Sequence, residues 1–115
     1  MIASFPRRGE VWTVNFYPGR GSGQRGTRPA LVIQNDVGNE HAATTIVAAI
    51  TSTLKLYPVT VLLHRGEGGV RRASMVNLAQ LLTVDKSRLR QRLGALSPER
   101  LRSVDSAIQV SLDVP

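Results

Sequence analysis

The sequence predicts an α+β fold in which a small, strongly curved antiparallel sheet, or partial barrel, is closed by one C-terminal helix. Three observations support this prediction. The 115 residues suffice for one domain with one core. Five or six short apolar segments alternate with turn residues, and only the last segment repeats its apolar residues at helical spacing. We therefore expect a single domain over residues 1–115.

Four strands are predicted before residue 66. Each is a β-branched, aromatic or continuous apolar run that is bounded by Gly, Pro or polar residues. These strands cover residues 10–16, 30–33, 44–50 and 59–63. In the first, Trp12, Val14 and Phe16 face one side, as in a half-buried strand. The second is apolar throughout and indicates a central strand buried on both faces. Residues 34–40 are predicted to form a turn-rich connection.

The second half of the chain is less regular until its last segment. Residues 70–84 fit one long strand, or two separated by a bend, and a bulge is expected there. The arginine-rich residues 85–94 fit either a short helix or an edge strand. A helix then begins after Ser97, which is a good N-cap, with Pro98 at the first helical position and Leu96 able to pack on Leu101.

We expect the apolar face of this helix to pack on the sheet. The residues expected on that face are Leu101, Val104, Ile108, Ser111 and Leu112. The small, strongly curved antiparallel sheet gives the predicted fold an SH3-like character.

Composition narrows the possible functions. Fifteen Lys and Arg against eight Asp and Glu give a net charge of +7, which favours nucleic acid, an anionic membrane or an acidic protein as partner. The absence of cysteine excludes disulfides, thiolate zinc sites and cysteine nucleophiles. His41 and His64 are the only imidazoles and lie in no motif, so we expect surface positions for both, and neither a metal nor another cofactor.

No apolar run approaches the roughly 20 residues that span a bilayer, and the first residues lack the apolar segment of a signal peptide. We therefore expect a cytoplasmic protein without a membrane partner.

The strongest chemical signal is the segment of residues 17–28, which contains four glycines and three arginines. Segments of this length without secondary structure are uncommon in small domains unless they are functional. Its last residue, Arg28, begins a buried strand, so the guanidinium is held in place and can direct two donors at a phosphate. A solvated or ion-paired arginine is the structural alternative.

A second signal follows the third predicted strand, which ends at Thr51 and Ser52. If neighbouring strands run antiparallel, Thr51 lies beside Arg28 and can offer a hydroxyl to a phosphate oxygen. A simple turn at the strand end is the alternative use of this threonine. Tyr17 can stack on a base. Arg71 and Arg72, together with the series Arg88, Arg90 and Arg92, can extend a basic track.

Several runs, spread over nearly the whole chain, resemble the MazF/PemK family of toxin endoribonucleases, which are relatives of the CcdB gyrase poisons. The runs are RGEVW at 8–12, GSGQ at 21–24, RPALVIQND at 28–36, IVAAITS at 46–52, SMVNLAQ at 74–80 and LTVDK at 82–86. Their order and spacing make chance similarity improbable.

The resemblance implies a homodimer of SH3-like barrels that acts as an mRNA interferase and is neutralised by an acidic antitoxin. Such an enzyme cleaves single-stranded RNA at a short sequence without metal, leaving a 2′,3′-cyclic phosphate and a 5′-hydroxyl. The resemblance implies that Arg28 and Thr51 form the catalytic centre. It implies RNA-binding roles for Tyr17, Ser22, Gln24, Arg25, Ser52 and Gln80.

The chain departs from the family pattern at Gly23, where many relatives carry a glutamate. The expected carboxylate base is therefore missing, and arginine is a poor base at neutral pH. Water, a phosphate oxygen or a nearby group such as Asp36 is left to accept the proton. Two other functions stay open, namely a CcdB-like, non-enzymatic toxin that binds gyrase and an RNA-binding module without turnover.

Overall fold

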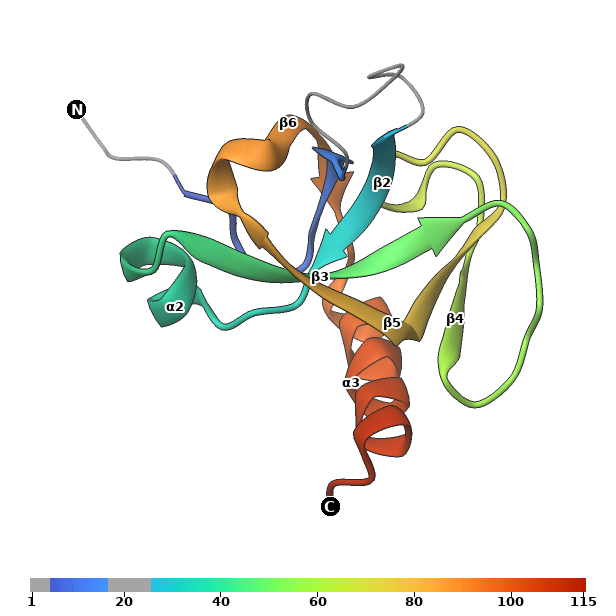
Figure 1. Ribbon diagram of the computed structural model, residues 1–115. Helices are drawn as coiled ribbons and strands as arrows, with labels where there is room; N and C mark the ends of the chain where they lie inside the picture. Colours follow the sequence, from blue (N-terminus) through green and yellow to red (C-terminus); the bar gives the residue numbers. More distant parts are fainter. Residues whose placement is uncertain (1–4, 17–25) are drawn as a thin grey trace.

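Antiparallel strands curl into one six-stranded sheet in the computed structural model, which describes residues 5–16 and 26–115 (Figure 1). The strands are β1 (Glu10–Asn15), β2 (Thr27–Val32), β3 (Thr44–Thr51), β4 (Thr60–Leu63), β5 (Ser74–Asp85) and β6 (Leu89–Ala95). Their order in the sheet is β4-β5-β3-β2-β1-β6. The predicted α+β fold, a curled antiparallel half-barrel with a C-terminal helix, is confirmed.

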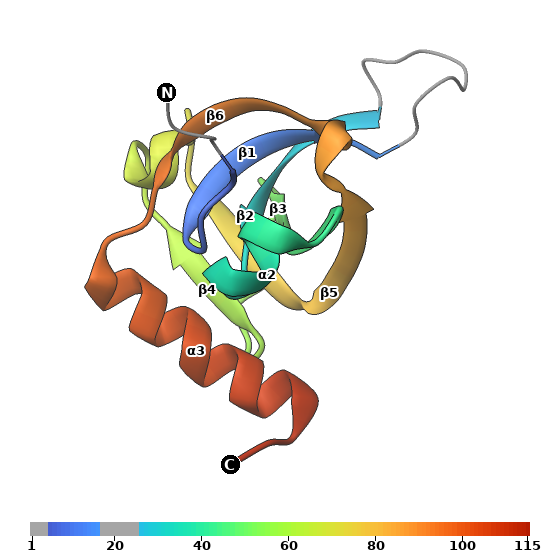
Figure 2. The ribbon, with the colours of Figure 1, turned by 90° about the vertical axis from the view of Figure 1, so that its left-hand side faces the viewer.

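The sheet bends round on itself, and the helix α3 (Pro98–Leu112) lies against β4 and β5 (Figure 2). Apolar side chains form a cluster on each face. The larger cluster, which includes Val11, Leu31 and Leu63, packs with Val104 and Ala107 of α3. The smaller one comprises Val14, Ala30, Val32, Val47 and Val84, with Trp12, Phe16 and Leu89 packed against it. Strand β2 therefore contributes to both clusters, as its continuous apolar run predicts.

The predicted start of α3 is confirmed, and one residue of its predicted face is wrong. The Ser97 side chain accepts a hydrogen bond from the Arg100 backbone N–H at 3.1 Å and caps the helix. Ser111 Oγ donates to the Leu78 carbonyl at 2.7 Å, which ties the last turn to β5. Leu112, however, is 53% exposed, because it is the last residue of the helix and lies beyond the edge of the larger cluster.

Two segments of uncertain character are resolved by the structure. The prediction of a turn-rich connection over residues 34–40 is wrong in part, because α2 (Asp36–His41) is a short helix. Asn35 caps it by accepting from the Gly38 N–H at 2.8 Å, and the buried Asn39 side chain accepts from Thr45 Oγ1 at 2.6 Å. Residues 85–94 form the 3₁₀ turn η2 (Lys86–Arg88) and the edge strand β6.

The expected bulge lies in β5. Its pairing with β3 shifts between Ala48, which pairs with Leu81, and Ala49, which pairs with Asn77. Three β5 residues, 78–80, lie between these two pairs, so the strand bends sharply there. The part of β5 before the bend also pairs with β4, so that one long strand joins β3 and β4. In the described part of the chain, no helix is long and apolar enough to cross a membrane.

Candidate functional site

Strand pairing brings Arg28 and Thr51 together. Ala30 pairs with Ala49 and Leu31 pairs with Ala48, so continuing this register by two residues sets Arg28 opposite Thr51. Arg28 also pairs with Val14 of β1, and therefore begins a strand that has neighbours on both sides. The juxtaposition that antiparallel pairing predicts is present in the structure.

Two adjoining hollows share Arg28, Pro29, Ile50 and Thr51. The first, which we call the arginine cavity, has a volume of about 420 Å³. Its other lining residues are Thr13, Ser52, Gly69, Val70, Arg71, Arg72, Ser74, Gln91 and Leu93. The second, which we call the Gln80 cavity, has a volume of about 370 Å³. It is completed by Phe16, Ala49, Gln80 and Leu82. The Arg28–Thr51 pair thus lies where the two cavities meet.

The Thr51 hydroxyl is held by a turn. Its Oγ1 accepts a hydrogen bond from the Thr53 backbone N–H at 3.1 Å, which is the turn arrangement that the sequence left as the alternative. A hydroxyl can accept and donate at the same time. The turn therefore fixes the oxygen while its proton stays available for a phosphate, so that the structural and the chemical interpretations of Thr51 are compatible.

The other predicted RNA-binding residues separate into two groups. Ser52 is exposed and lines the arginine cavity, whereas Gln80 is exposed on β5 and lines the Gln80 cavity. They line different cavities, which share the Arg28–Thr51 pair. The remaining predicted residues, Tyr17, Ser22, Gln24 and Arg25, lie outside the described residues, as does Gly23.

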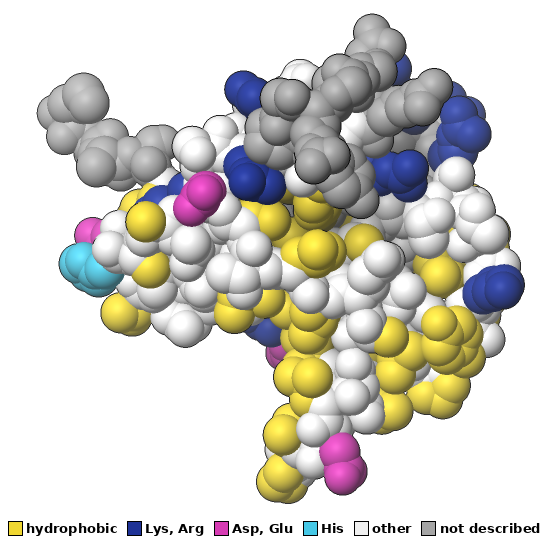
Figure 3. All heavy atoms as spheres, viewed as in Figure 1, with side chains coloured by type: hydrophobic (Ala, Val, Ile, Leu, Met, Phe, Trp, Pro, Cys, Tyr) yellow, Lys and Arg dark blue, Asp and Glu magenta, His cyan; other side chains and the backbone are white. Residues whose placement is uncertain are grey.

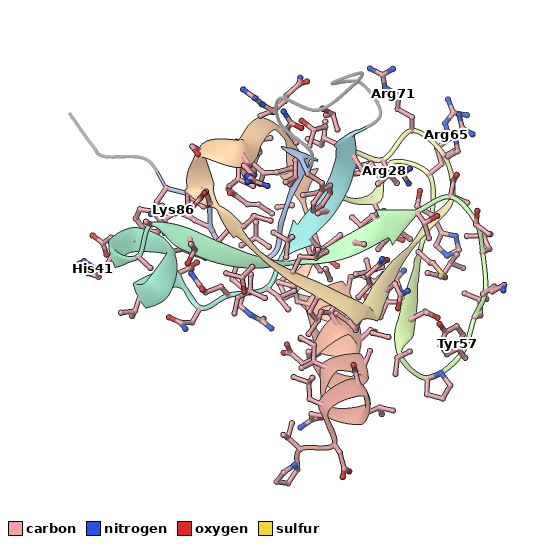
Figure 4. All side chains as sticks on the ribbon, in the orientation of Figure 1. Arg28, His41, Tyr57, Arg65, Arg71 and Lys86 are labelled. Carbon is pink, nitrogen blue, oxygen red and sulfur yellow. The ribbon has the colours of Figure 1, made fainter. Side chains whose placement is uncertain are left out.

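Positive charge is concentrated at the arginine cavity. Arg28, Arg71 and Arg72 all line it, and none of them has an ion pair in the part of the chain that the structure describes. Figure 4 shows Arg28, Arg65 and Arg71 at the same end of the molecule, away from His41 and Lys86. Figure 3 shows the dark blue side chains gathered at that end. Other arginines are neutralised elsewhere, in the pairs Arg8–Asp105, Arg92–Glu10 and Arg100–Glu67.

No carboxylate lines either cavity, although all eight Asp and Glu residues lie within the described ranges. The suggestion that Asp36 accepts a proton near Arg28 is wrong. Asp36 lies beyond the far end of β2. The strand alone separates Arg28 from Val32 by four residue steps, or about 13 Å. Its Oδ1 accepts instead from the Arg8 backbone N–H at 2.7 Å and from Asn39 Nδ2 at 3.2 Å.

The two histidines lie away from the cavities. His41 is exposed on α2, with its Nε2 3.6 Å from Glu40 Oε1, and His64 is exposed just after β4. Within residues 5–16 and 26–115, no cluster of three His, Asp or Glu side chains could hold a metal ion. The surface positions expected for both histidines are confirmed.

A structured turn presents Arg71 and Arg72. The 3₁₀ turn η1 (Glu67–Gly69) precedes them, and Glu67 receives two hydrogen bonds from Arg100, at 2.9 and 3.0 Å. Glu67 Oε1 also accepts from the His64 backbone N–H at 2.7 Å. The bonds from Arg100 hold the pKa of the Glu67 carboxyl below its ordinary value. This turn is therefore fixed to α3 at neutral pH.

Sequence reasoning missed Thr13 and Gln91 among the polar residues of the arginine cavity. Thr13 of β1 and Gln91 of β6 face it, and Thr13 Oγ1 accepts from the Gln91 backbone N–H at 3.0 Å. The alternation of β1 places Thr13 on the side opposite Trp12, but nothing in the sequence says that β6 pairs with β1.

Comparisons with known proteins show the family to which the chain belongs. A family model described as "PemK-like, MazF-like toxin of type II toxin-antitoxin system" matches residues 7–112. A curated relative, the endoribonuclease MazF of Staphylococcus saprophyticus, is 39% identical over 108 residues, which cover 92% of this chain and 90% of the relative.

Solved structures are similar over nearly the whole chain. A crystal structure of MazF from Deinococcus radiodurans matches with a TM-score of 0.77 and 26% identity, covering 97% of this chain and 100% of that one. An endoribonuclease in complex with its cognate antitoxin, from a mycobacterial species, matches with a TM-score of 0.80 and 24% identity, covering 96% and 97%. On the family match and the curated relative, this chain belongs to the PemK-like, MazF-like toxin family of type II toxin-antitoxin systems.

Proposed function

We propose that this protein is an endoribonuclease toxin that cuts single-stranded RNA at a short sequence without a metal ion, with Arg28 and Thr51 at the reaction centre. The observation that carries the proposal is the arginine cavity, where the Arg28–Thr51 pair lies beside Arg71 and Arg72, which have no ion pair among the described residues, and where no carboxylate lines the walls. Family membership and the endoribonuclease relative support an RNA-cleaving toxin. They do not favour the alternative of a CcdB-like toxin that binds gyrase.

The reaction needs no nucleophile from the protein. The 2′-oxygen of the substrate bonds to the adjacent phosphorus while the bond from phosphorus to the 5′-oxygen breaks. The products are a 2′,3′-cyclic phosphate and a 5′-hydroxyl. Negative charge builds up on the phosphate oxygens in the transition state, where the Arg28 guanidinium and the Thr51 hydroxyl can stabilise it.

Proton transfer relies on groups other than carboxylates of this chain. Because none of its eight Asp and Glu side chains lines the cavities, we assign the 2′-hydroxyl proton to water or to a phosphate oxygen. The leaving 5′-oxygen takes its proton from solvent. Arg28 and Thr51 then supply geometry and charge, and not acid–base chemistry.

The positions of Ser52 and Gln80 support a path for the RNA. They line different cavities, and both cavities include the Arg28–Thr51 pair. A strand whose scissile phosphate lies at this pair would extend into both cavities, and it would meet Ser52 on one side and Gln80 on the other. We assign further RNA contacts to Tyr17, Ser22, Gln24 and Arg25.

We further propose a cytoplasmic homodimer that an acidic antitoxin inhibits. The arginines at the cavity attract an acidic chain, and the net charge of +7 adds to this attraction. Leu54, Leu56 and Tyr57 are 47%, 63% and 48% exposed between β3 and β4, and a partner chain would shield them. The mycobacterial relative has been solved with its cognate antitoxin.

The protein is expected to cut single-stranded RNA in excess EDTA. The same sequence as DNA should resist, since it lacks the 2′-hydroxyl, and duplex RNA should resist, since its backbone is held away from the in-line geometry. Gel analysis of an end-labelled RNA with mapping of the cut sites tests this. Loss of cleavage on chelation, or efficient cutting of DNA, would refute the proposed chemistry. Binding without any cutting would instead indicate an RNA-binding module.

An acidic peptide that mimics an antitoxin tail is expected to inhibit cleavage competitively with RNA. If it occupies the arginine cavity, its inhibition constant should rise steeply as KCl increases from 50 to 400 mM, because exposed charges are screened. Inhibition constants from initial rates provide the measurement, with an uncharged peptide of equal length as control. A peptide that binds without inhibiting would show that the acidic partner and the RNA do not share this surface.

A further inference from the structure

Arg71 and Arg72 are the charged residues of the arginine cavity for which the proposed chemistry has no task. Both are exposed, and both lie on the segment between η1 and β5 that forms one wall of the cavity. They do not line the Gln80 cavity, whereas Arg28 lines both. The pair therefore marks one side of the reaction centre.

The backbone that carries this pair is held by two neighbouring elements and by a hydrogen bond within the turn. The Glu67–Arg100 ion pair ties η1 to α3, and the Gly66 backbone N–H donates to the Val70 carbonyl at 2.9 Å. Gly69 lies directly on β6, so close that a Cβ atom there would be 2.2 Å from the Leu93 carbonyl oxygen. Arginines on such a support have less backbone freedom to lose when they bind a ligand.

The chemistry of the cavity fits a phosphodiester. Within residues 5–16 and 26–115 the two adjacent guanidinium groups have no carboxylate partner, so they attract an anion. Arginine forms paired hydrogen bonds with phosphate oxygens. The cavity volume of about 420 Å³ lies within the range of about 300 to 1,000 Å³ typical of small-molecule pockets. Thr13, Ser52 and Gln91 add polar groups to the walls.

We propose that Arg71 and Arg72 bind a second phosphate of the RNA strand, next to the scissile phosphate at Arg28 and Thr51. This inference rests on the proposed function and deepens it. Because the pair lines only one of the two cavities, it fixes the direction in which the strand crosses the reaction centre. Arg71 and Arg72 are substrate-positioning residues in this arrangement and do not contact the reacting atoms.

A binding experiment tests the pair without turnover. The probe is a fluorescent 12-nucleotide 2′-O-methyl RNA, which cannot be cut, titrated by anisotropy in 50 to 400 mM KCl. The double variant R71A/R72A is expected to bind roughly tenfold more weakly at 100 mM salt. Its slope of log Kd against log salt concentration should fall by about 0.7, the value for one phosphate contact on a single strand.

The matched control is the double variant R7A/R102A. It removes the same charge from two exposed arginines that line neither cavity. Its salt slope and affinity should stay near those of the wild type. Equal losses in both double variants would mean that net charge alone is responsible, and the subsite would be refuted. Since all four side chains are exposed, circular dichroism and thermal melting should show native folding for both proteins.

Cleavage kinetics locate the second phosphate. On an RNA that contains the mapped cut site, R71A/R72A should raise KM about tenfold and leave kcat within about threefold. Replacing one neighbouring phosphate by an uncharged methylphosphonate should raise the wild-type KM to a similar extent, and should raise it no further in R71A/R72A. The assignment would be overturned if, at both neighbouring phosphates, the methylphosphonate and R71A/R72A raised KM additively. A hundredfold fall in the kcat of R71A/R72A would also overturn it. If the wild type cuts no RNA, the proposed function fails, and the anisotropy experiment still tests the arginine pair.

Discussion

Replacing Arg28 by alanine is expected to lower the single-turnover rate of RNA cleavage by about 10² to 10³ while leaving the fold intact. Removal of one preorganised donor from a site that stabilises developing negative charge typically has an effect of this size. The side chain is exposed and has no ion pair within the described residues, so the native state loses little when it is removed. Single-turnover rates on one mapped RNA, together with thermal melting of each protein, provide the measurement.

The conservative variants sharpen this test. Arg28→Lys keeps the charge but cannot reproduce the planar fork of two donors, so it should recover little of the rate. Thr51→Ala should lower the rate less than Arg28→Ala, and Thr51→Ser should restore it because the hydroxyl is retained. Thr53→Ala is the matched control, since Thr53 is exposed in the same turn and lines neither cavity. A wild-type rate for either alanine variant would refute the assigned centre, and unfolding of Arg28→Ala would make Arg28 structural.

The Arg28–Thr51 pair was accessible from the sequence because each residue lies near one end of a strand that the sequence predicts. The apolar run that follows Arg28 and the β-branched strand that ends at Thr51 need only antiparallel pairing to bring the two residues together. The capped terminal helix was accessible as well, since Ser97 and Pro98 act within one turn. Signals of this kind lie within a few residues of the feature that they specify.

Other features depend on contacts between distant segments, and the sequence does not indicate them. Arg71 and Arg72 line the arginine cavity because η1 packs against β6. The sequence left β6 open as either a short helix or an edge strand. The helix α2 was missed because its six residues are stabilised by tertiary contacts, such as the buried bond from Thr45 to Asn39. Asp36 follows Arg28 closely in the sequence, yet an intervening strand separates the two in space.

Gly69→Ala is expected to lower the free energy of unfolding by about 2 to 5 kcal/mol. Two costs contribute to this value. Gly69 has a φ of +82°, in the left-handed region where an L side chain is strained by about 1 to 2 kcal/mol. A Cβ atom would also lie 2.2 Å from the Leu93 carbonyl oxygen, so β6 or the turn must move, and overpacking of this kind costs about 1 to 3 kcal/mol. Urea unfolding at one fixed protein concentration measures the change.

Gly66→Ala separates the two costs. Gly66 has a φ of +95°, close to that of Gly69, but a Cβ atom there would meet nothing within 4 Å. It should therefore lose only the strain of about 1 to 2 kcal/mol, and the difference between the two variants measures the contact with β6. Because displacement of the turn also moves Arg71 and Arg72, Gly69→Ala should raise KM for RNA under conditions in which it is still folded, whereas Gly66→Ala should not. Equal destabilisation by the two substitutions would show that β6 yields to the added methyl group. The turn would then give the arginine pair no rigid support.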